Sequence, residues 1–367
     1  MRRIWLTLAV ALNLAAMPAA AQSLYEDGTE AYDNGDHADA ARIFRRACDG
    51  GEALACTFLG YMLERGEGVE QDEAGAGALY AQACGMAEVS GCYNLGVLTE
   101  QGRGVAKDER RAAALYEQAC DGGDIGGCYN LGVLFDQGRG VASNQARAAR
   151  LYRESCDGGE PMGCTNLGFL YENGEGVRRD RERAAELYRQ GCDGGNALGC
   201  SNLGVLHEDG LGVEQDAVQA AALYGQACDG GVAIGCNNLG VLYENGNGVP
   251  RDERRAVELY GQSCDGEDPL GCSNLGVLYQ DGRGVGQDEA RAADARPGRA
   301  ARVRVPVVVR VHALRGRRAR HARARRHLPH PRHRGSGDRL LALSRGSGRG
   351  GQGRRAAPRN GVPAARP

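Results

Sequence analysis

The feature that most constrains the fold is an internal repeat with a period of 36 residues. The motif N-L-G-V-L begins at Asn94, and the same or a closely similar motif recurs at that interval along the chain. The asparagines that open the six copies are Asn94, Asn130, Asn166, Asn202, Asn238 and Asn274. A fixed period of this length predicts a repeat architecture, because one such unit is too short to bury its own apolar face and must pack on its neighbours.

The sequence of each unit predicts two helices joined by a glycine-rich turn. Around Asn94, the first helix is expected over residues 89–101 and ends at Gly102, since glycine adopts the left-handed cap conformation at little cost. The second helix is expected from the N-capping Asp108 to Cys120. Equivalent capping residues are Asp72, Asn144, Asp180, Asp216, Asp252 and Asp288. The predicted fold class is therefore all-α, a solenoid of helix–turn–helix units.

Small residues in both helices indicate close packing between them. Gly96 and its equivalents fall in the middle of the expected first helix, where glycine costs about 1 kcal/mol relative to alanine. We expect this cost to be offset by close approach of a neighbouring helix. The Ala112–Ala113 pair of the second helix suits the same tight packing.

The cysteines follow the same period, and all 14 belong to seven C-x7-C pairs. The pairs are Cys48 with Cys56, Cys84 with Cys92, Cys120 with Cys128, Cys156 with Cys164, Cys192 with Cys200, Cys228 with Cys236, and Cys264 with Cys272. An even number of cysteines in a chain with a secretory signal favours disulfides. Each disulfide would join the end of one unit to the start of the next and add about 2–3 kcal/mol to the free energy of unfolding. Zinc is the alternative, but zinc sites usually separate paired cysteines by about two to four residues. We expect no metal and no cofactor.

The termini differ from the repeat region in composition. Residues 1–21 resemble a secretory signal, with Arg2 and Arg3, an apolar stretch over 4–16 and small residues before Gln22. The apolar stretch is too short to span a bilayer comfortably, and nothing later resembles a transmembrane helix. We therefore expect a periplasmic or secreted monomer that does not insert into a membrane after signal cleavage.

The net charge of −2 conceals an acidic body and a basic tail. Residues 22–295 contain 22 basic and 46 acidic residues, whereas residues 296–367 contain 21 arginines and one acidic residue. An acidic body repels phosphate, so we expect no nucleic acid partner for the repeat region.

The repeat, which we assign to residues 22–293, breaks down in the segment 294–367. Position 296 is Arg where the period predicts Tyr, and position 300 is Ala where it predicts Cys. We favour a frameshift as the origin of this arginine-rich segment, and a genuine basic tail that binds nucleic acid or anionic envelope polymers is the alternative. Resequencing the gene around codons 290–296 distinguishes the two. In either case we expect a disordered tail, a truncated last unit and fraying of that end.

The stretch NLGVLYENGNGVPRDERRAVELY, residues 238–260, resembles the Sel1-like repeat, a relative of the tetratricopeptide repeat. The C-x7-C pairs narrow the resemblance to the secreted cysteine-rich subgroup typified by the Helicobacter cysteine-rich protein family. It covers roughly residues 24–293. The resemblance implies a right-handed α-solenoid whose concave groove, lined by the first helices, binds proteins or peptides. Some members of that subgroup are also described as penicillin-binding or as β-lactamases.

The residues themselves give little support to an enzyme. A serine β-lactamase needs a motif such as S-x-x-K, but the only lysine is Lys107 and Gly104 stands three residues before it. His37 and His207 lie about five units apart, and His207 takes a position that other units give to Tyr171 and Tyr243. The hydrolase alternative therefore rests on the resemblance alone. We predict a non-catalytic scaffold that binds proteins or peptides.

The asparagine row is the candidate peptide-binding site. Asn130 directly precedes the core-facing Leu131, and one residue is about 100° of helical turn, so its side chain can flank the core and face the groove. An asparagine amide offers both donors and an acceptor, which suits the backbone of an extended peptide. The alternative is a structural ladder, in which each Asn bonds a neighbouring unit's backbone or the next Asn. The sequence leaves both possibilities open.

Overall fold

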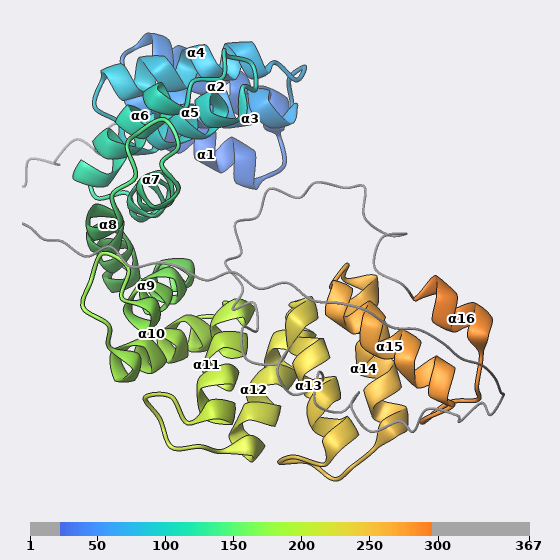
Figure 1. The fold of residues 1–367 in the computed structure, drawn as a ribbon. Coiled ribbons are helices and arrows are strands. Elements are labelled where there is room, and N and C mark those ends of the chain that lie inside the picture. The colour runs from blue at the N-terminus through green and yellow to red at the C-terminus, as the bar shows by residue number, and fades with distance from the viewer. Residues whose placement is uncertain (1–22, 296–367) are drawn as a thin grey trace, which may run out of the picture. The chain divides into compact units, whose positions relative to one another are not determined.

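The computed structural model describes residues 23–295, and these residues form helices joined by short turns (Figure 1). The predictions of a signal over 1–21 and of a disordered or frameshifted tail from 296 concern residues outside the described range. The helices are α1 (Leu24–Asp33), α2 (His37–Asp49), α3 (Ala53–Arg65), α4 (Glu73–Gly85), α5 (Val89–Gln101), α6 (Glu109–Asp121), α7 (Ile125–Gln137), α8 (Gln145–Asp157), α9 (Pro161–Asn173), α10 (Arg181–Asp193), α11 (Ala197–Asp209), α12 (Ala217–Asp229), α13 (Ala233–Asn245), α14 (Glu253–Asp265), α15 (Pro269–Asp281) and α16 (Glu289–Asp294).

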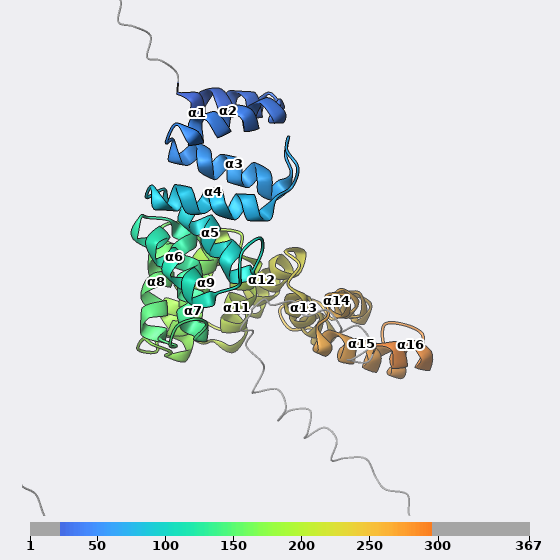
Figure 2. The same ribbon diagram turned by 90° about the horizontal axis from the view of Figure 1, so that it is seen from above.

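The predicted fold class, an all-α solenoid of helix–turn–helix units, is confirmed. Odd-numbered helices are the first helices of the units and even-numbered helices are the second helices. Each helix packs against the next one along the chain, as both views show (Figure 2). The first unit, α1 and α2, has no cysteine in its first helix and forms an N-terminal cap within the described range, where no earlier helix packs on α1.

The helix ends agree with the sequence prediction. The Asp108 carboxylate accepts hydrogen bonds from the backbone N–H groups of Arg110 and Arg111 at 3.0 Å and so caps α6. Gly102 ends α5 in the left-handed conformation, with a φ of 75°. These caps satisfy backbone groups that a helix end otherwise leaves without partners. Local sequence therefore sets the length of each helix.

The mid-helix glycines have the packing role that the sequence suggested. In the six units from α3–α4 to α13–α14, this glycine faces the ring of a tyrosine on the following second helix, and a Cβ added to it would lie 2.7–2.9 Å from a ring carbon. The pairs are Gly60 with Tyr80, Gly96 with Tyr116, Gly132 with Tyr152, Gly168 with Tyr188, Gly204 with Tyr224, and Gly240 with Tyr260. These tyrosines are at most 1% exposed, so they form the centre of each unit's core.

A polar network that the sequence analysis did not predict connects the units. The Tyr116 hydroxyl donates a hydrogen bond to the Glu100 carboxylate at 2.7 Å. Arg139, in the turn after α7, bridges Glu100 at 2.9 Å and Glu109 at 2.7 Å. Burial, followed by the charge of Glu100, raises the pKa of Tyr116. The network thereby holds a buried hydroxyl in its protonated, donating form.

The last unit is incomplete within the described range. Helix α16 has six residues, none of them buried, whereas the second helices before it have 13. Helix α15 buries only Gly271, Cys272 and Leu278, and its Val277 is 47% exposed. The predicted truncation of this unit stays a prediction, because the residues after 295 lie outside the described range. Fraying of the same end stays a prediction.

Candidate functional site

The six asparagines lie on one side of consecutive first helices. The residue four positions before each asparagine and the residue three positions after it share that side, because this spacing follows the helical period. We call this surface the asparagine face. Its residues are Ser90, Asn94 and Val97 on α5; Gly126, Asn130 and Val133 on α7; Met162, Asn166 and Phe169 on α9; Leu198, Asn202 and Val205 on α11; Ile234, Asn238 and Val241 on α13; and Leu270, Asn274 and Val277 on α15.

None of the six asparagines is fully exposed. Asn202 and Asn238 are each only 4% exposed, and the other four are half-buried. In the sequence all six hold equivalent positions of the repeat. The structure divides them into four that retain accessible surface and two that lie inside the packing.

Hydrogen bonds between neighbouring first helices account for part of the asparagine row. The Asn166 amide donates to the Tyr129 hydroxyl at 3.5 Å, which links α9 to α7. The Asn274 amide donates to the Asn237 side-chain oxygen at 2.8 Å, which links α15 to α13. In both cases the partner is the residue just before the asparagine of the preceding unit. These two bonds link neighbouring first helices as a ladder would, but the partners are a tyrosine hydroxyl and Asn237 and not a backbone group or the next asparagine of the row.

Tyr93 and Tyr129 are features of the site that the sequence analysis did not identify. Their rings lie 6.0 Å from those of Tyr116 and Tyr152, respectively. Burial raises the pKa of both Tyr93 and Tyr129; for Tyr93 the next cause is the charge of Asp124. Later units have Thr165, Ser201, Asn237 and Ser273 at this position. That change from aromatic to small polar residues is the sequence feature that could have indicated a special role for Tyr93 and Tyr129.

Apolar side chains flank the asparagines. Met162 is 44% exposed, Leu270 is 42% exposed, and both stand four residues before an asparagine. Of the residues three positions after the asparagines, Val133 and Phe169 are partly buried and pack on the core, whereas Val277 is 47% exposed. The asparagine face therefore alternates amide groups with apolar surface, a combination that can contact both the backbone and the side chains of an extended segment.

The structure contains all seven disulfides that the sequence predicted, each between the second helix of one unit and the first helix of the next. The bonded pairs are Cys48 with Cys56, Cys84 with Cys92, Cys120 with Cys128, Cys156 with Cys164, Cys192 with Cys200, Cys228 with Cys236, and Cys264 with Cys272. The second cysteine of each pair lies within the packing, since Cys56, Cys92, Cys128, Cys164, Cys200, Cys236 and Cys272 are all at most 6% exposed. These cysteines therefore hold the units together and do not belong to the accessible part of the asparagine face.

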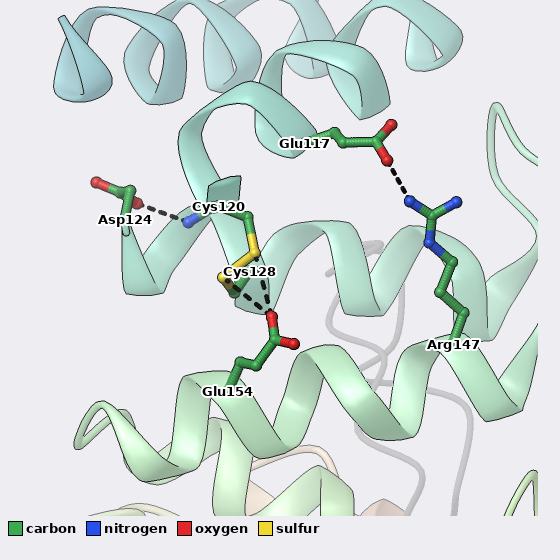
Figure 3. Close-up of a disulfide and its surroundings, with 7 residues drawn as sticks. Glu117, Cys120, Asp124, Cys128, Arg147 and Glu154 are labelled. Carbon is green, nitrogen blue, oxygen red and sulfur yellow. Dashed lines mark hydrogen bonds and ion pairs between the residues drawn. A yellow bond between two sulfur atoms is a disulfide. The ribbon is translucent and has the colours of Figure 1, made fainter. Parts of the chain in front are cut away.

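The bridge between Cys120 on α6 and Cys128 on α7 also contacts the following unit. The carboxylate of Glu154 on α8 lies 3.6 and 3.9 Å from the two sulfurs (Figure 3). A disulfide sulfur carries no proton, so this is a sulfur–oxygen contact and not a hydrogen bond. Glu117 and Arg147 add an ion pair between α6 and α8. Three consecutive helices are therefore joined around one bridge.

The described residues include one group of possible metal ligands and the histidines and lysine that were considered for catalysis. Among them, Cys120, Cys128 and Glu154 have ligand atoms close enough to hold a metal ion, but the two sulfurs are bonded to each other and supply no thiolate. His37 stacks on Tyr32, with ring centroids 4.7 Å apart. His207 and Lys107 belong to different units, and Lys107 Nζ lies 4.0 Å from Glu109.

In the described part of the chain, no helix combines the length and the apolar character needed to cross a membrane.

Fold and site together define a class of protein: a helical-repeat scaffold whose consecutive units are joined by disulfides. The chain belongs to the Sel1 repeat family. The family model, described as Sel1 repeat, matches residues 9–52, 53–86, 89–124, 126–160, 161–196, 197–232, 233–268 and 269–294. No curated protein matches the chain.

Two solved structures with TM-scores above 0.6 share the helical-repeat fold. A protective antigen present in uropathogenic Escherichia coli strains, displaying an SLR fold, is 30% identical, with a TM-score of 0.67 over 74% of this chain and 59% of that one. The chain thus spans about 59% of the antigen's length. A Sel1 repeat protein from Oxalobacter formigenes is 22% identical, with a TM-score of 0.62 over 66% of this chain and 97% of that one. Cysteine-rich protein B of Helicobacter pylori is 26% identical over 39% of this chain and 96% of that one, with a TM-score of 0.30.

Proposed function

We propose that this protein is an exported, non-catalytic scaffold that binds an extended protein or peptide segment along the asparagine face. The observation that carries the proposal is the composition of that face, where half-buried asparagines alternate with partly exposed apolar side chains over consecutive units. Sel1 repeats commonly mediate protein interactions, which supports the same class of function.

Asn94, Asn130, Asn166 and Asn274 are the proposed ligand contacts, because each retains accessible surface. An asparagine amide has two N–H donors and an acceptor oxygen, so a single ladder bond does not use its full capacity. A bound peptide backbone would take over or extend these bonds. Asn202 and Asn238 would act mainly by holding neighbouring first helices together, since they are buried.

The disulfides support a site of action in the periplasm or outside the cell. Seven bridges form in the described residues, which indicates an oxidising compartment. We propose that the protein acts there as a monomer.

The test is capture of partners from an envelope fraction by the oxidised protein. We expect Asn130→Ala with Asn166→Ala to reduce capture strongly, whereas Asn247→Ala leaves it unchanged because Asn247 lies in an exposed turn away from the asparagine face. Thermal unfolding of the double variant checks that the solenoid stays folded. Equal capture by wild type and a folded double variant overturns the proposal. Nitrocefin hydrolysis by the wild type would instead support the hydrolase alternative.

A further inference from the structure

The disulfide between Cys120 on α6 and Cys128 on α7 differs from its neighbours in the side chain that contacts its sulfurs. The Glu154 carboxylate oxygen Oε2 lies 3.6 Å from the Cys120 sulfur and 3.9 Å from the Cys128 sulfur (Figure 3). At four other bridges a glutamine amide oxygen takes this place, 3.2–3.4 Å from the nearer sulfur. These contacts are Gln118 with Cys84, Gln190 with Cys156, Gln226 with Cys192, and Gln262 with Cys228. Among these five bridges, only that of Cys120 and Cys128 therefore has an anionic oxygen beside it.

Two cysteines and a carboxylate form a donor set that suits a metal ion such as zinc, which binds thiolate sulfur and carboxylate oxygen. Within the described range, Cys120, Cys128 and Glu154 are the group whose ligand atoms lie close enough together to share one ion. A neutral amide oxygen adds no charge that would attract the cation. The donor set becomes complete only when the bridge is reduced, because the thiolate is the metal ligand.

The contacts of Glu154 match the geometry of such a site. In a tetrahedral zinc site, bonds of about 2.3 Å to sulfur and about 2.1 Å to oxygen place a sulfur and an oxygen ligand about 3.6 Å apart. The two sulfur–oxygen distances at this bridge are 3.6 and 3.9 Å. The same bond lengths place two sulfur ligands about 3.8 Å apart, which is farther than a covalent bond allows. Opening of the bridge and rotation of the two cysteine side chains would therefore complete the site.

The long C-x7-C spacing does not prevent the two cysteines from sharing an ion. Zinc-binding cysteines usually lie about two to four residues apart, because a short loop then brings their sulfurs together. The packing of α6 on α7 has the same effect, since the Cα atoms of Cys120 and Cys128 are 4.6 Å apart. The ion pair of Glu117 and Arg147 joins α6 to α8 independently of the bridge and so keeps Glu154 near (Figure 3). Because Glu154 is exposed and Cys120 half-buried, an ion and a water ligand can reach them.

We propose that Cys120, Cys128 and Glu154 bind a thiophilic divalent cation, such as zinc, after a dithiol reductant has opened the bridge. The two thiols of the reductant become a disulfide, and their protons pass to the two cysteine sulfurs. The cation displaces these two protons to solvent and bonds to both thiolates, the carboxylate oxygen and a water molecule. This site goes beyond the proposed scaffold function and does not depend on it.

The experiment measures how zinc protects individual thiols from alkylation. The full protein is partly reduced with a phosphine, which takes oxygen from water and leaves two thiols at each opened bridge. The phosphine concentration is raised until the bridge of Cys120 and Cys128 opens, and the phosphine is then removed. Iodoacetamide labels the thiols with or without zinc chloride, and mass spectrometry measures labelling at each cysteine.

We expect zinc to slow the labelling of Cys120 and Cys128 at least about tenfold, because a metal-bound thiolate is a poor nucleophile. Cys192 and Cys200 are the matched control within the same molecule, since their bridge contacts the neutral Gln226. Zinc should change their labelling less than about twofold.

Two substitutions exchange the carboxylate and the amide between units. Glu154→Gln gives this bridge the amide that its neighbours have, and it should abolish the protection. Gln190→Glu places a carboxylate beside the bridge of Cys156 and Cys164, whose sulfurs lie 3.4 and 3.9 Å from the Gln190 oxygen. This variant should add protection at Cys156 and Cys164. Far-ultraviolet circular dichroism checks that both variants stay folded, and the gain in Gln190→Glu decides alone if Glu154→Gln does not fold.

Three results would overturn the proposal. Zinc that gives no protection at Cys120 and Cys128 shows that no ion binds there. Protection that persists in a folded Glu154→Gln, or that is equal at Cys192 and Cys200, shows that two thiols suffice without the carboxylate. None of these results bears on the asparagine face, because its test uses the oxidised protein.

Discussion

At the scale of single residues, the glycine–tyrosine pairs explain why the repeat tolerates poor helix formers. Glycine destabilises a helix interior by about 1 kcal/mol relative to alanine. In the six units from α3–α4 to α13–α14 it leaves the space that a buried tyrosine ring occupies on the next helix. The packing of that ring offsets the local cost, so a residue that is unfavourable for its own helix is favourable for the pair of helices.

Gly168→Ala should therefore destabilise the protein even though it raises local helix propensity. The new Cβ would lie 2.9 Å from a ring carbon of Tyr188, and we expect a net loss of about 1–2 kcal/mol in the free energy of unfolding. Gly261→Ala is the matched control, because nothing lies within 4 Å of a Cβ at that helical position. Urea unfolding of the oxidised variants measures both. A stabilising Gly168→Ala would show that the ring moves freely.

The buried tyrosines predict a loss of stability in alkali. Burial, followed by the charge of Glu172, raises the pKa of Tyr188 well above its ordinary value of about 10. A group whose pKa is raised by folding contributes stability that is fully present below its unfolded pKa and is lost as pH rises from there through the folded-state pKa. Tyr188→Phe should cost about 1–3 kcal/mol near neutral pH, because it removes the hydrogen bond to Glu172.

The measurement is the unfolding free energy of wild type and Tyr188→Phe as a function of pH. We expect the difference between them to shrink above about pH 10, since only the wild type must keep Tyr188 protonated to stay folded. If the difference in unfolding free energy stays constant across this pH range, the loss of stability in alkali does not come from the Tyr188 hydroxyl.

At the scale of elements, each unit combines local signals with one covalent link. Capping aspartates and left-handed glycines set the ends of the helices, and the disulfide fixes the second helix of one unit to the first helix of the next. The sequence predicted these features because all of them depend on residues close together in the chain. The Tyr93 and Tyr129 contacts were not predicted, because they join residues far apart in the chain. Tyr93 contacts Tyr116 on the second helix of its own unit, and Tyr129 contacts Asn166 in the next unit.

Removal of one bridge should weaken the protein without changing its fold. Cys120→Ser with Cys128→Ser should lower the free energy of unfolding by about 2–3 kcal/mol, because the bridge closes a short loop and reduces the entropy of the unfolded chain. Urea unfolding under oxidising conditions gives the value, and far-ultraviolet circular dichroism checks the helix content. A loss close to zero would indicate that Glu154, Arg147 and their neighbours hold the two helices without the bond.

At the scale of the whole repeat region, stability should follow the completeness of each unit. In a repeat protein, stability is approximately a sum of terms within units and between neighbours. The last unit lacks most of its second helix in the described range, and α16 buries no residue. Its stability should therefore be the lowest among the units that follow the N-terminal cap.

Hydrogen exchange measures this difference directly. We expect amides of α15 and α16 to exchange faster than those of α9 and α10, because opening the last unit breaks contacts with one neighbour only. The disulfide between Cys264 and Cys272 should limit the effect to the part of α15 beyond Cys272. Equal protection of α9 and α15 would contradict the predicted fraying.

The sequence alone determined the repeat, the helix boundaries, the disulfide pairing and the family. Each of these depends on periodicity or on residues that are neighbours along the chain, so no long-range geometry is needed to derive them. Only the tertiary structure separated the buried Asn202 and Asn238 from the four asparagines that keep accessible surface. It also placed acidic, aromatic and apolar groups of different units beside one face. Such distinctions depend on contacts between units. A repeated motif has the same local sequence in every unit, so it does not show which copy is buried by its neighbours.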